Sequence, residues 1–508
     1  MSSTTGYVDD VPYTADFYPE TAPAHIAFAA LCRGKPPALA RRPHRVLELG
    51  CGQGFGLAVL AASNPEVAFE GCDFNAEQVV HARSLIADAA LANVTVSHTS
   101  FEEAARHGAN DVDVAIAHGI LSWIEPASQR AVVANLERRL LPNGLAYVSY
   151  NCMPGWAPLA PIRRLILEVK QRNPGDSATQ IRIALELIEK LWRTNAGYFV
   201  MNPMAAHHVG AMLTMDRAYL AHEYLVERAE LPLFADVAAI LASAGLTFVA
   251  SAALLDNFDT YAAPETVRPL IAQVDDPILR ETVRDFAANR KFRRDIYARG
   301  TNELSGEERR RLWSELSFAL AVPRARLTLQ FLGPVGDITL KPEFHAPVAD
   351  VLVRGNASFD ELLALPVFGP ANVELLIECL ALLIHSGQVL PVPPNGKPDI
   401  RPAQRFNRVI AERARIGQFY QHLAAPAVGT GIRIDEFGAL ALGAVLDGRA
   451  DPAAAAEQGL AILDAIGRRP RRDDRPIEDD RSAVAFIIER IVRVFEEQVP
   501  LWQRLGAI

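Results

Sequence analysis

The sequence predicts an α/β fold built around a parallel sheet, and three observations support this prediction. Residues 46–49 (Val-Leu-Glu-Leu) form an apolar, strand-like segment that leads directly into a glycine-rich turn at 50–54. A second apolar segment, 67–72, ends in Asp73. Strand-like and helical segments then alternate as far as residue 150, which is the pattern of consecutive β–α–β units.

The glycine-rich turn predicts a ligand site. Its glycines Gly50, Gly52 and Gly54 accept positive φ and have no Cβ, so a ligand can approach the backbone closely. A dinucleotide fingerprint would need the spacing G-x-G-x-x-G, but position 55 is phenylalanine. Asp73 lies about 20 residues beyond the turn, where a carboxylate is well placed to bind two ribose hydroxyls.

Glu48 indicates the kind of ligand, because it lies two residues before the turn. A carboxylate is a poor neighbour for a pyrophosphate, which favours N–H groups and positive charge, but it suits a ligand that carries an ammonium and a sulfonium. The motif E-x-G-x-G-x-G with a following acidic strand end resembles the S-adenosylmethionine (AdoMet) site of class I methyltransferases. The alternative is an unliganded turn in another α/β fold. The resemblance implies AdoMet as cofactor, bound by Glu48, Gly50, Cys51, Gly52, Gly54, Asp73 and Phe74.

Three later strands are expected to complete the same crevice. The third strand-like segment is followed by Ser100 and Phe101, which match the adenine-binding turn of class I methyltransferases, although Asp is commoner than Ser there. His118 follows the fourth strand and Asn151 follows the fifth. Ligands of open parallel sheets bind beyond the carboxyl ends of the strands. We therefore expect these residues to lie around one crevice with Asp73.

At 508 residues the chain is too long for one ordinary core, so two to four domains are expected. Two strands near 246–250 and 292–298 are expected to complete a Rossmann-like methyltransferase sheet. The predicted order is an N-terminal lid segment (1–44), an AdoMet-binding core (45–157), a helical insertion with a regulatory or dimerisation role (158–232), the completion of the sheet (233–300), a winged-helix-like module (330–395) and a helical C-terminal domain (400–508). A homodimer is one expectation from this arrangement.

The winged-helix-like module is expected to contact protein rather than DNA. Its third helix, 372–385, carries Glu374 and Glu378 and has no Lys or Arg. A helix that faces phosphates needs cations. Within the tail, the stretch 468–475 is rich in Arg and Asp whose charges nearly cancel, and it is predicted to be a solvated linker.

Composition excludes several function classes. The net charge of −9 gives no overall attraction to nucleic acid or to an anionic membrane. No apolar run approaches 18 residues, and residues 1–10 lack the apolar core of a signal peptide, so a cytoplasmic protein is expected. The five cysteines are scattered without CxxC spacing, which predicts reduced thiols and no metal site. His207 and His208 have no third ligand nearby in the sequence.

Further stretches resemble one family in particular. They are Ala-His-Gly-Ile-Leu-Ser-Trp (117–123), Tyr-Val-Ser-Tyr-Asn (147–151), Pro-Gly-Trp (154–156), Tyr-Leu-Ala-His-Glu-Tyr-Leu (219–225) and Asn-Arg-Lys-Phe-Arg (289–293). These are similar to bacterial methyltransferases with a methyltransferase regulatory domain, some of which methylate lysines of an outer-membrane autotransporter. The resemblance implies AdoMet-binding roles for Glu48, Gly50, Gly52, Asp73 and His118. It carries no short motif for lysine specificity.

Methyl transfer from a sulfonium is an in-line displacement, so the enzyme must align a nucleophile that has a free lone pair. For a lysine with a pKa of about 10.4, deprotonation at pH 7 costs roughly 4–5 kcal/mol, and a dry channel beside a sulfonium lowers that cost. Aromatic faces tolerate an alkylated ammonium. Histidine is a candidate base, although a cofactor-positioning or structural role suits His118 equally. Candidate channel and catalytic residues are Tyr13, Tyr18, His118, Trp123, Tyr150 and Trp156.

The predicted function is therefore an AdoMet-dependent methyltransferase that acts on protein lysine. One alternative is an O- or N-methyltransferase of a small molecule, and another is a non-enzymatic scaffold that binds AdoMet as a regulator. A nucleic-acid base methyltransferase is disfavoured, because the segment after the fourth strand lacks the [DN]-P-P-[YF] pattern that holds a flipped base. His222 and Glu223 in the insertion are interpreted as a structural contact between helices.

Overall fold

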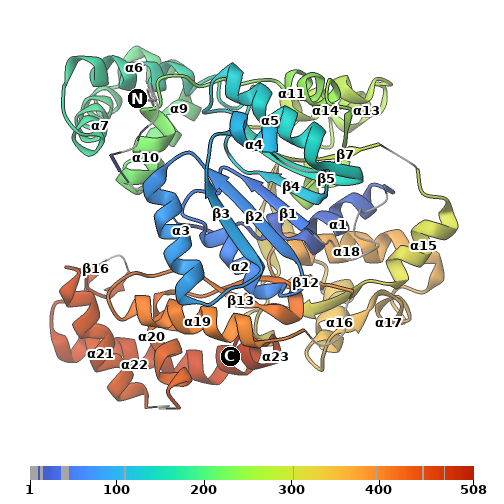
Figure 1. The fold of residues 1–508 in the computed structure, drawn as a ribbon. Helices are drawn as coiled ribbons and strands as arrows, with labels where there is room; N and C mark the ends of the chain where they lie inside the picture. The colour runs from blue at the N-terminus through green and yellow to red at the C-terminus, as the bar shows by residue number, and fades with distance from the viewer. Residues whose placement is uncertain are drawn as a thin grey trace.

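The computed structural model describes residues 8, 10–11, 15–35, 45–107, 110–300, 303–394, 398–448, 451–473 and 475–508. At its centre is a seven-stranded sheet with the strand order β3-β2-β1-β4-β5-β7-β6 (Figure 1). The first five strands are parallel, and β7 runs antiparallel between β5 and β6. The strands are β1 (Arg45–Leu49), β2 (Ala68–Asp73), β3 (Val94–His98), β4 (Val112–Ala117), β5 (Leu140–Asn151), β6 (Leu246–Ser251) and β7 (Phe292–Arg299).

This topology confirms the predicted Rossmann-like methyltransferase sheet, including the closing pair of strands. Alternate side chains of β1 enter different cores, since successive strand residues point to opposite faces. Val46 packs with α1–α3, and Leu47 packs with α4, α5 and α11. The helices on these two faces are α1 (Pro23–Cys32), α2 (Phe55–Ser63), α3 (Ala76–Asp88), α4 (Phe101–His107), α5 (Pro126–Arg139) and α11 (Phe234–Ala242).

A helical insertion between β5 and α11 has a hydrophobic core of its own. Figure 1 shows it at one end of the molecule, away from the C-terminal helices. Its amphipathic helices α6 and α7 pack together through buried residues such as Ile166 and Ile181. The insertion comprises α6 (Ala160–Arg172), α7 (Ser177–Arg193), α8 (Gly197–Met201), α9 (Pro203–Met212) and α10 (Arg217–Tyr224). These bounds fall inside the predicted range 158–232.

Between β7 and β12 the described residues form α15 (Gly306–Ser314), three further helices and a three-stranded sheet of order β11-β8-β12. The strand β8 (Ser317–Leu320) lies before residue 330, outside the predicted bounds of the module. α18 is almost wholly apolar and is buried along eight residues, with Glu378 bonded to Tyr261 of the sheet domain. The remaining elements are β9 (Gln330–Gly333), β10 (Gly336–Thr339), α16 (Pro342–Leu352), β11 (Ala357–Ser358), α17 (Phe359–Leu363), α18 (Val373–His385) and β12 (Val389–Val392).

The C-terminal segment covers α2 from the side opposite the sheet. α2 has the sequence Phe-Gly-Leu-Ala-Val-Leu-Ala-Ala-Ser, and a helix without a polar face must be covered on all sides. The tail contains a β-hairpin, β13–β14, in addition to the helices expected there. Its elements are α19 (Arg401–Ala414), β13 (His422–Ala425), β14 (Thr430–Arg433), α20 (Glu436–Leu446), α21 (Pro452–Ala465), β15 (Arg471–Arg472), β16 (Arg475–Pro476), α22 (Asp480–Arg493) and α23 (Val499–Arg504).

No helix in the described ranges combines the length and the apolar character needed to cross a bilayer.

Candidate functional site

A cavity of about 420 Å³ lies at the carboxyl ends of β1, β2, β4 and β5. The glycine turn and Asp73 form one end of it, and α10 with the first residues of β7 forms another wall. Part of the N-terminal segment, including Tyr18, also lines the cavity. Its volume is in the range of ordinary ligand and cofactor sites.

The turn at 50–54 has a conformation that requires glycine. Gly50, Gly52 and Gly54 have φ of 74°, 54° and 69°, a region that residues with a Cβ rarely adopt. A Cβ on Gly50 would lie 2.7 Å from Ile120 Cγ2, and one on Gly54 would lie 2.5 Å from Ala82 Cβ. The three glycines therefore let the chain pass between β1 and α2 and leave backbone facing the cavity.

Two carboxylates face this turn. Asp73 accepts hydrogen bonds from the backbone N–H groups of Gly52 and Asn75, both at 2.9 Å. Each of its oxygens keeps a further lone pair for a ligand. Burial, together with the nearby Asp73, raises the pKa of Glu48 to about 8. Glu48 is therefore largely protonated at pH 7, and a cation beside it would favour its ionised form, so this end of the cavity suits a cationic ligand with hydroxyl groups.

His118 lies at the centre of the cavity, after β4. The ring of Tyr18 stacks on it with centroids 3.9 Å apart, and its Nδ1 lies 3.0 Å from the Tyr147 hydroxyl and 3.1 Å from the Ser149 hydroxyl. Desolvation lowers the pKa of His118 to about 4, so the imidazole is neutral at pH 7. Burial raises the pKa of Tyr18 to about 12, so its phenol stays protonated.

The far end of the cavity is aromatic. Trp123 and Trp156 meet edge to face with ring centroids 6.2 Å apart, and Trp156 also contacts Tyr224. Gly155 brings Trp156 into place, because its N–H donates to the carbonyl of Arg290 at 2.8 Å and a Cβ there would lie 2.5 Å from backbone. The glycine of the motif Pro-Gly-Trp therefore allows the loop after β5 to pack closely against the loop before β7.

Glu223 is the acidic group at this end. It lines the cavity from α10, and one of its oxygens accepts a hydrogen bond from the Asn151 amide at 3.1 Å. Burial raises the pKa of Glu223 to about 7. Its neighbour His222 also lines the cavity, and its Nε2 lies 2.7 Å from the carbonyl oxygen of Val11. The interpretation of both residues as a structural contact fits the bond of His222 to Val11. It did not predict that Glu223 lines the cavity.

Sequence spacing predicts only that Glu223 and Tyr219 share a helix face, not that this face meets the cavity. Tyr219 and Glu223 are four residues apart on a helix, and such residues share one face. Both line the cavity. Lys291, Phe292 and Arg294, which lie just before or within β7, also line the cavity and were not predicted from the sequence.

Most of the candidate residues from the sequence are brought together here. Tyr18, Glu48, Gly50, Cys51, Gly52, Gly54, Asp73, Phe74, Phe101, His118, Trp123, Asn151 and Trp156 all line the cavity. Ser100 does not line it, because its hydroxyl accepts a hydrogen bond from the N–H of Glu103 at the start of α4. Tyr13 lies outside the described residues.

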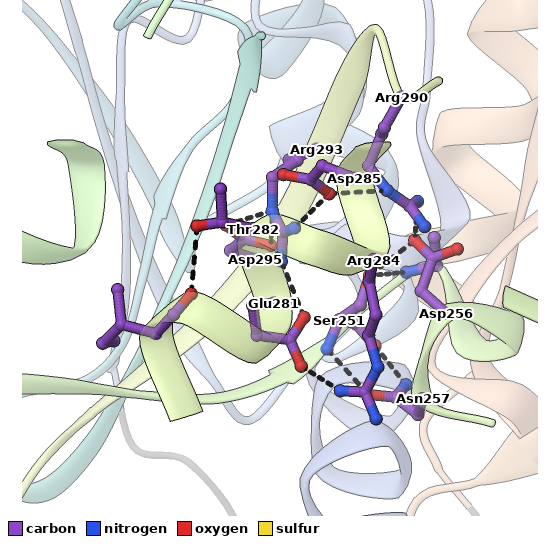
Figure 2. Close-up of polar contacts among 12 residues, drawn as sticks. Ser251, Asp256, Asn257, Glu281, Thr282, Arg284, Asp285, Arg290, Arg293 and Asp295 are labelled. Atoms are coloured by element: carbon purple, nitrogen blue, oxygen red, sulfur yellow. Dashed lines mark hydrogen bonds and ion pairs between the residues drawn. The ribbon is translucent and has the colours of Figure 1, made fainter. Parts of the chain in front are cut away.

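Tyr150 also lies away from the cavity, in a network of buried ions behind β7. Its hydroxyl donates to Asp295 at 2.6 Å. Arg293, next in this network, pairs with Asp285 at 2.5 Å and with Asp295 at 2.9 Å, and Glu281 lies 3.3 Å away (Figure 2). Arg293 points behind the sheet while Phe292 and Arg294 reach the cavity, so the network fixes this wall.

Comparison with protein families matches two parts of the chain. Residues 47–146 match the family described as "Methyltransferase domain", which includes the glycine turn and Asp73. Residues 216–299 match the family described as "Predicted methyltransferase regulatory domain", which includes α10 and β7. The two matches therefore lie on opposite walls of the cavity.

Among curated proteins, the chain is 29% identical over 508 residues to an uncharacterized protein of Synechocystis sp., with 100% of both chains covered. It is 28% identical over 289 residues to an uncharacterized protein of Rickettsia prowazekii, covering 56% of this chain and 51% of that protein. Among solved structures, it resembles PKMT2 from Rickettsia typhi in complex with AdoHcy, with a TM-score of 0.67 and 19% identity over 95% of this chain and 98% of that chain. The whole fold, appendages included, is thus shared with that structure. Over residues 47–146 and 216–299 the chain is thus similar to methyltransferases with a methyltransferase regulatory domain, and it is an AdoMet-dependent methyltransferase.

Proposed function

We propose that this methyltransferase transfers the methyl group of AdoMet to the side-chain nitrogen of lysine residues in proteins. The observation that carries the proposal is the far end of the cavity, where aromatic side chains surround the carboxylate of Glu223. A lysine side chain has a long apolar stem and a cationic tip, and it complements such an environment. The likeness to PKMT2, a protein-lysine methyltransferase, supports the same acceptor.

The residues at the other end fit AdoMet. We infer that Asp73 accepts hydrogen bonds from the ribose hydroxyls, that the glycine turn lies against the cofactor, and that Glu48 faces its positive charges. When bound, AdoMet supplies an electrophilic methyl group on a sulfonium. The neutral His118 and the ring of Tyr18 lie between the two ends, where they can position the acceptor without adding a charge.

A small-molecule acceptor is the second candidate function. It is favoured by the N-terminal segment, because Ala15, Asp16, Tyr18 and Thr21 lie over the cavity and would enclose a small substrate.

One assay separates the two candidates. The protein is incubated with tritiated AdoMet and a lysate of the host cell, and label is counted in the protein and small-molecule fractions. We expect label in discrete protein bands, whereas label only in small molecules would replace the lysine proposal.

The affinity for AdoMet is expected to depend on pH through Glu48. Its pKa is about 8 in the empty cavity, and a cation beside it favours the ionised form, so binding should release a proton. Below pH 8 the affinity should therefore rise with pH by up to about tenfold per unit, and above pH 8 it should level off. Calorimetry at pH 6, 7 and 8 measures this, and E48Q in the same buffers subtracts the ligand's own titration. Equal pH dependence of both proteins would contradict the role of Glu48.

Tyr18→Ala is expected to reduce turnover more than AdoMet binding. Removal of the ring that stacks on His118 should loosen acceptor alignment, and a misplaced acceptor costs about tenfold to a hundredfold in rate. The AdoMet dissociation constant should change by less than about threefold, since the ring of Tyr18 stacks on His118 rather than on the glycine turn or Asp73. Y18F keeps the ring and serves as the matched control. An equal loss of binding and turnover in Tyr18→Ala would make Tyr18 a cofactor or folding residue.

A further inference from the structure

Glu223 is a partly buried carboxylate that has a hydrogen-bond donor but no cation. Among the described residues it forms no ion pair within 4.0 Å, whereas its exposed neighbour Glu227 pairs with Lys170 at 3.6 Å. Lys291 and Arg163 are close enough to lower its pKa. Arg163 itself is engaged with the carbonyl of Val226. A buried charge without a partner is costly, so this position is complementary to a cationic ligand.

The surroundings of Glu223 select the kind of cation. Tyr219 lies one turn earlier on α10, and Trp156 and Tyr224 contact each other at the same end of the cavity. Aromatic faces attract ammonium groups, and more strongly where water is excluded. The Asn151 amide fixes one carboxylate oxygen, at the end of β5 where the acceptor of a parallel sheet enzyme sits. The other oxygen remains available to a ligand.

We propose that Glu223, positioned by Asn151, binds the ammonium group of the acceptor lysine and accepts one of its protons before methyl transfer. The inference rests on the proposed lysine methyltransferase function. An O–H bond forms on Glu223 as an N–H bond of the ammonium breaks. The freed lone pair then forms a bond to the methyl carbon, and the C–S electron pair passes to sulfur. The methylated product is again a cation, and Glu223 returns its proton to water.

The other groups in the cavity are less suited to this role. His118, with a pKa of about 4, is a weak base at neutral pH, and Tyr18, with a pKa of about 12, is protonated there. A general base works best when its pKa is near the working pH, and that of Glu223 is about 7. The titratable or polar groups that face Glu223 are Tyr18, Asn151, Arg163, Tyr219, Tyr224 and Lys291.

The test compares E223Q with the wild-type protein and with E227Q. Gln keeps the size and an acceptor for Asn151 but removes the charge, whereas E227Q removes an exposed charge four residues away. The rate of tritium transfer to lysine of lysate proteins is measured from pH 5.5 to 9. We expect the wild-type and E227Q rates to rise with pH and level off above about 7. We expect E223Q to lose about 10²–10⁴-fold and to lose this acidic limb.

A second readout needs no turnover. The peptide acetyl-Ala-Lys-Ala-amide is titrated into the AdoHcy complex of each protein, with tryptophan fluorescence as the signal and the norleucine peptide as a neutral control. E223Q should bind the lysine peptide at least tenfold more weakly and bind AdoHcy as well as the wild type does, which also shows that it is folded. No binding of the lysine peptide to the wild type, or equal binding by E223Q, would overturn Glu223 as the ammonium site.

The outcomes separate the inference from the function on which it rests. If the wild-type protein labels lysine and E223Q keeps both the rate within threefold and the acidic limb, the role of Glu223 is wrong while lysine methylation stands. If the wild-type protein labels no lysine, the proposed function fails and the inference fails with it.

Discussion

Replacing Arg293 with leucine is expected to destabilise the protein by about 3–5 kcal/mol, because removal of this buried cation would leave several buried carboxylates without a partner. Arg293 pairs with Asp285 and Asp295 and lies 3.3 Å from Glu281 (Figure 2). Its guanidinium also lies over the ring of Phe234, 4.2 Å from the ring centroid. The expected result is a fall of about 3–5 °C in the midpoint of thermal unfolding, since the unfolding entropy of a 508-residue chain is large.

The matched control is R311L. Arg311 is 68% exposed in its side chain and lies 3.9 Å from Glu315, four residues along the same helix. Exposed pairs of this kind contribute less than about 1 kcal/mol, so the midpoint should move by less than about 1 °C. If R293L and R311L shifted the midpoint equally, the buried network would not be the element that holds β7 against the cavity.

Asp73→Ala is expected to weaken AdoMet binding by about 1.5–3 kcal/mol, or roughly tenfold to 150-fold, through the loss of charge-assisted hydrogen bonds. Asp73 also accepts the N–H groups of Gly52 and Asn75, so its removal loosens the turn that faces the cofactor. D73N keeps an acceptor for only one of these two N–H groups and loses the charge, and it should fall between the wild type and Asp73→Ala. Calorimetry with AdoMet gives the three dissociation constants.

The exposed Glu77, near the start of α3, provides the control for loss of a nearby negative charge. E77Q should bind AdoMet within about twofold of the wild-type affinity. An unchanged dissociation constant in Asp73→Ala would remove the ribose-binding role from Asp73. A loss as large in E77Q would attribute the effect to overall charge rather than to hydrogen bonds.

The sheet was predictable because its signals are local. Each central strand is a short apolar run, and its end is marked by a turn residue such as Gly50 or an acidic residue such as Asp73. Strand order then follows from the few topologies that parallel β–α–β units allow. The positions of the glycine turn and of the end of β4 beside the cavity were also predictable, because parallel strands place their carboxyl ends at one edge of the sheet.

Elements that depend on distant partners were not predictable. The hairpin β13–β14 contains His-Leu-Ala-Ala, and alanine favours a helix in isolation. Packing on the apolar helix α2 decides its conformation. Tyr150 was expected in a channel, yet strand alternation turns it to the core, where Asp295 satisfies its hydroxyl. Glu223 reaches the cavity only because the insertion folds back over β5, which no local pattern encodes.

The segments that follow the seven-stranded sheet pack against the rest of the chain. The third helix of the predicted winged-helix-like module, α18, has no Lys or Arg and is buried against its own chain rather than presented to DNA. Phe17, next to the cavity residue Tyr18, packs against His422 of the tail with ring centroids 5.1 Å apart. The C-terminal segment therefore supports both α2 and the segment that covers the site.

The most direct test of lysine methylation identifies the amino acid that carries the label. Proteins labelled by the wild-type enzyme with tritiated AdoMet are hydrolysed in acid, and the labelled amino acids are separated by chromatography. The reference is Asp73→Ala, which is assayed at an AdoMet concentration below its weakened dissociation constant. We expect the label to migrate with methylated lysines and to be strongly reduced in the Asp73→Ala reaction. Label on another amino acid, or label in protein that does not depend on Asp73, would contradict the proposed function.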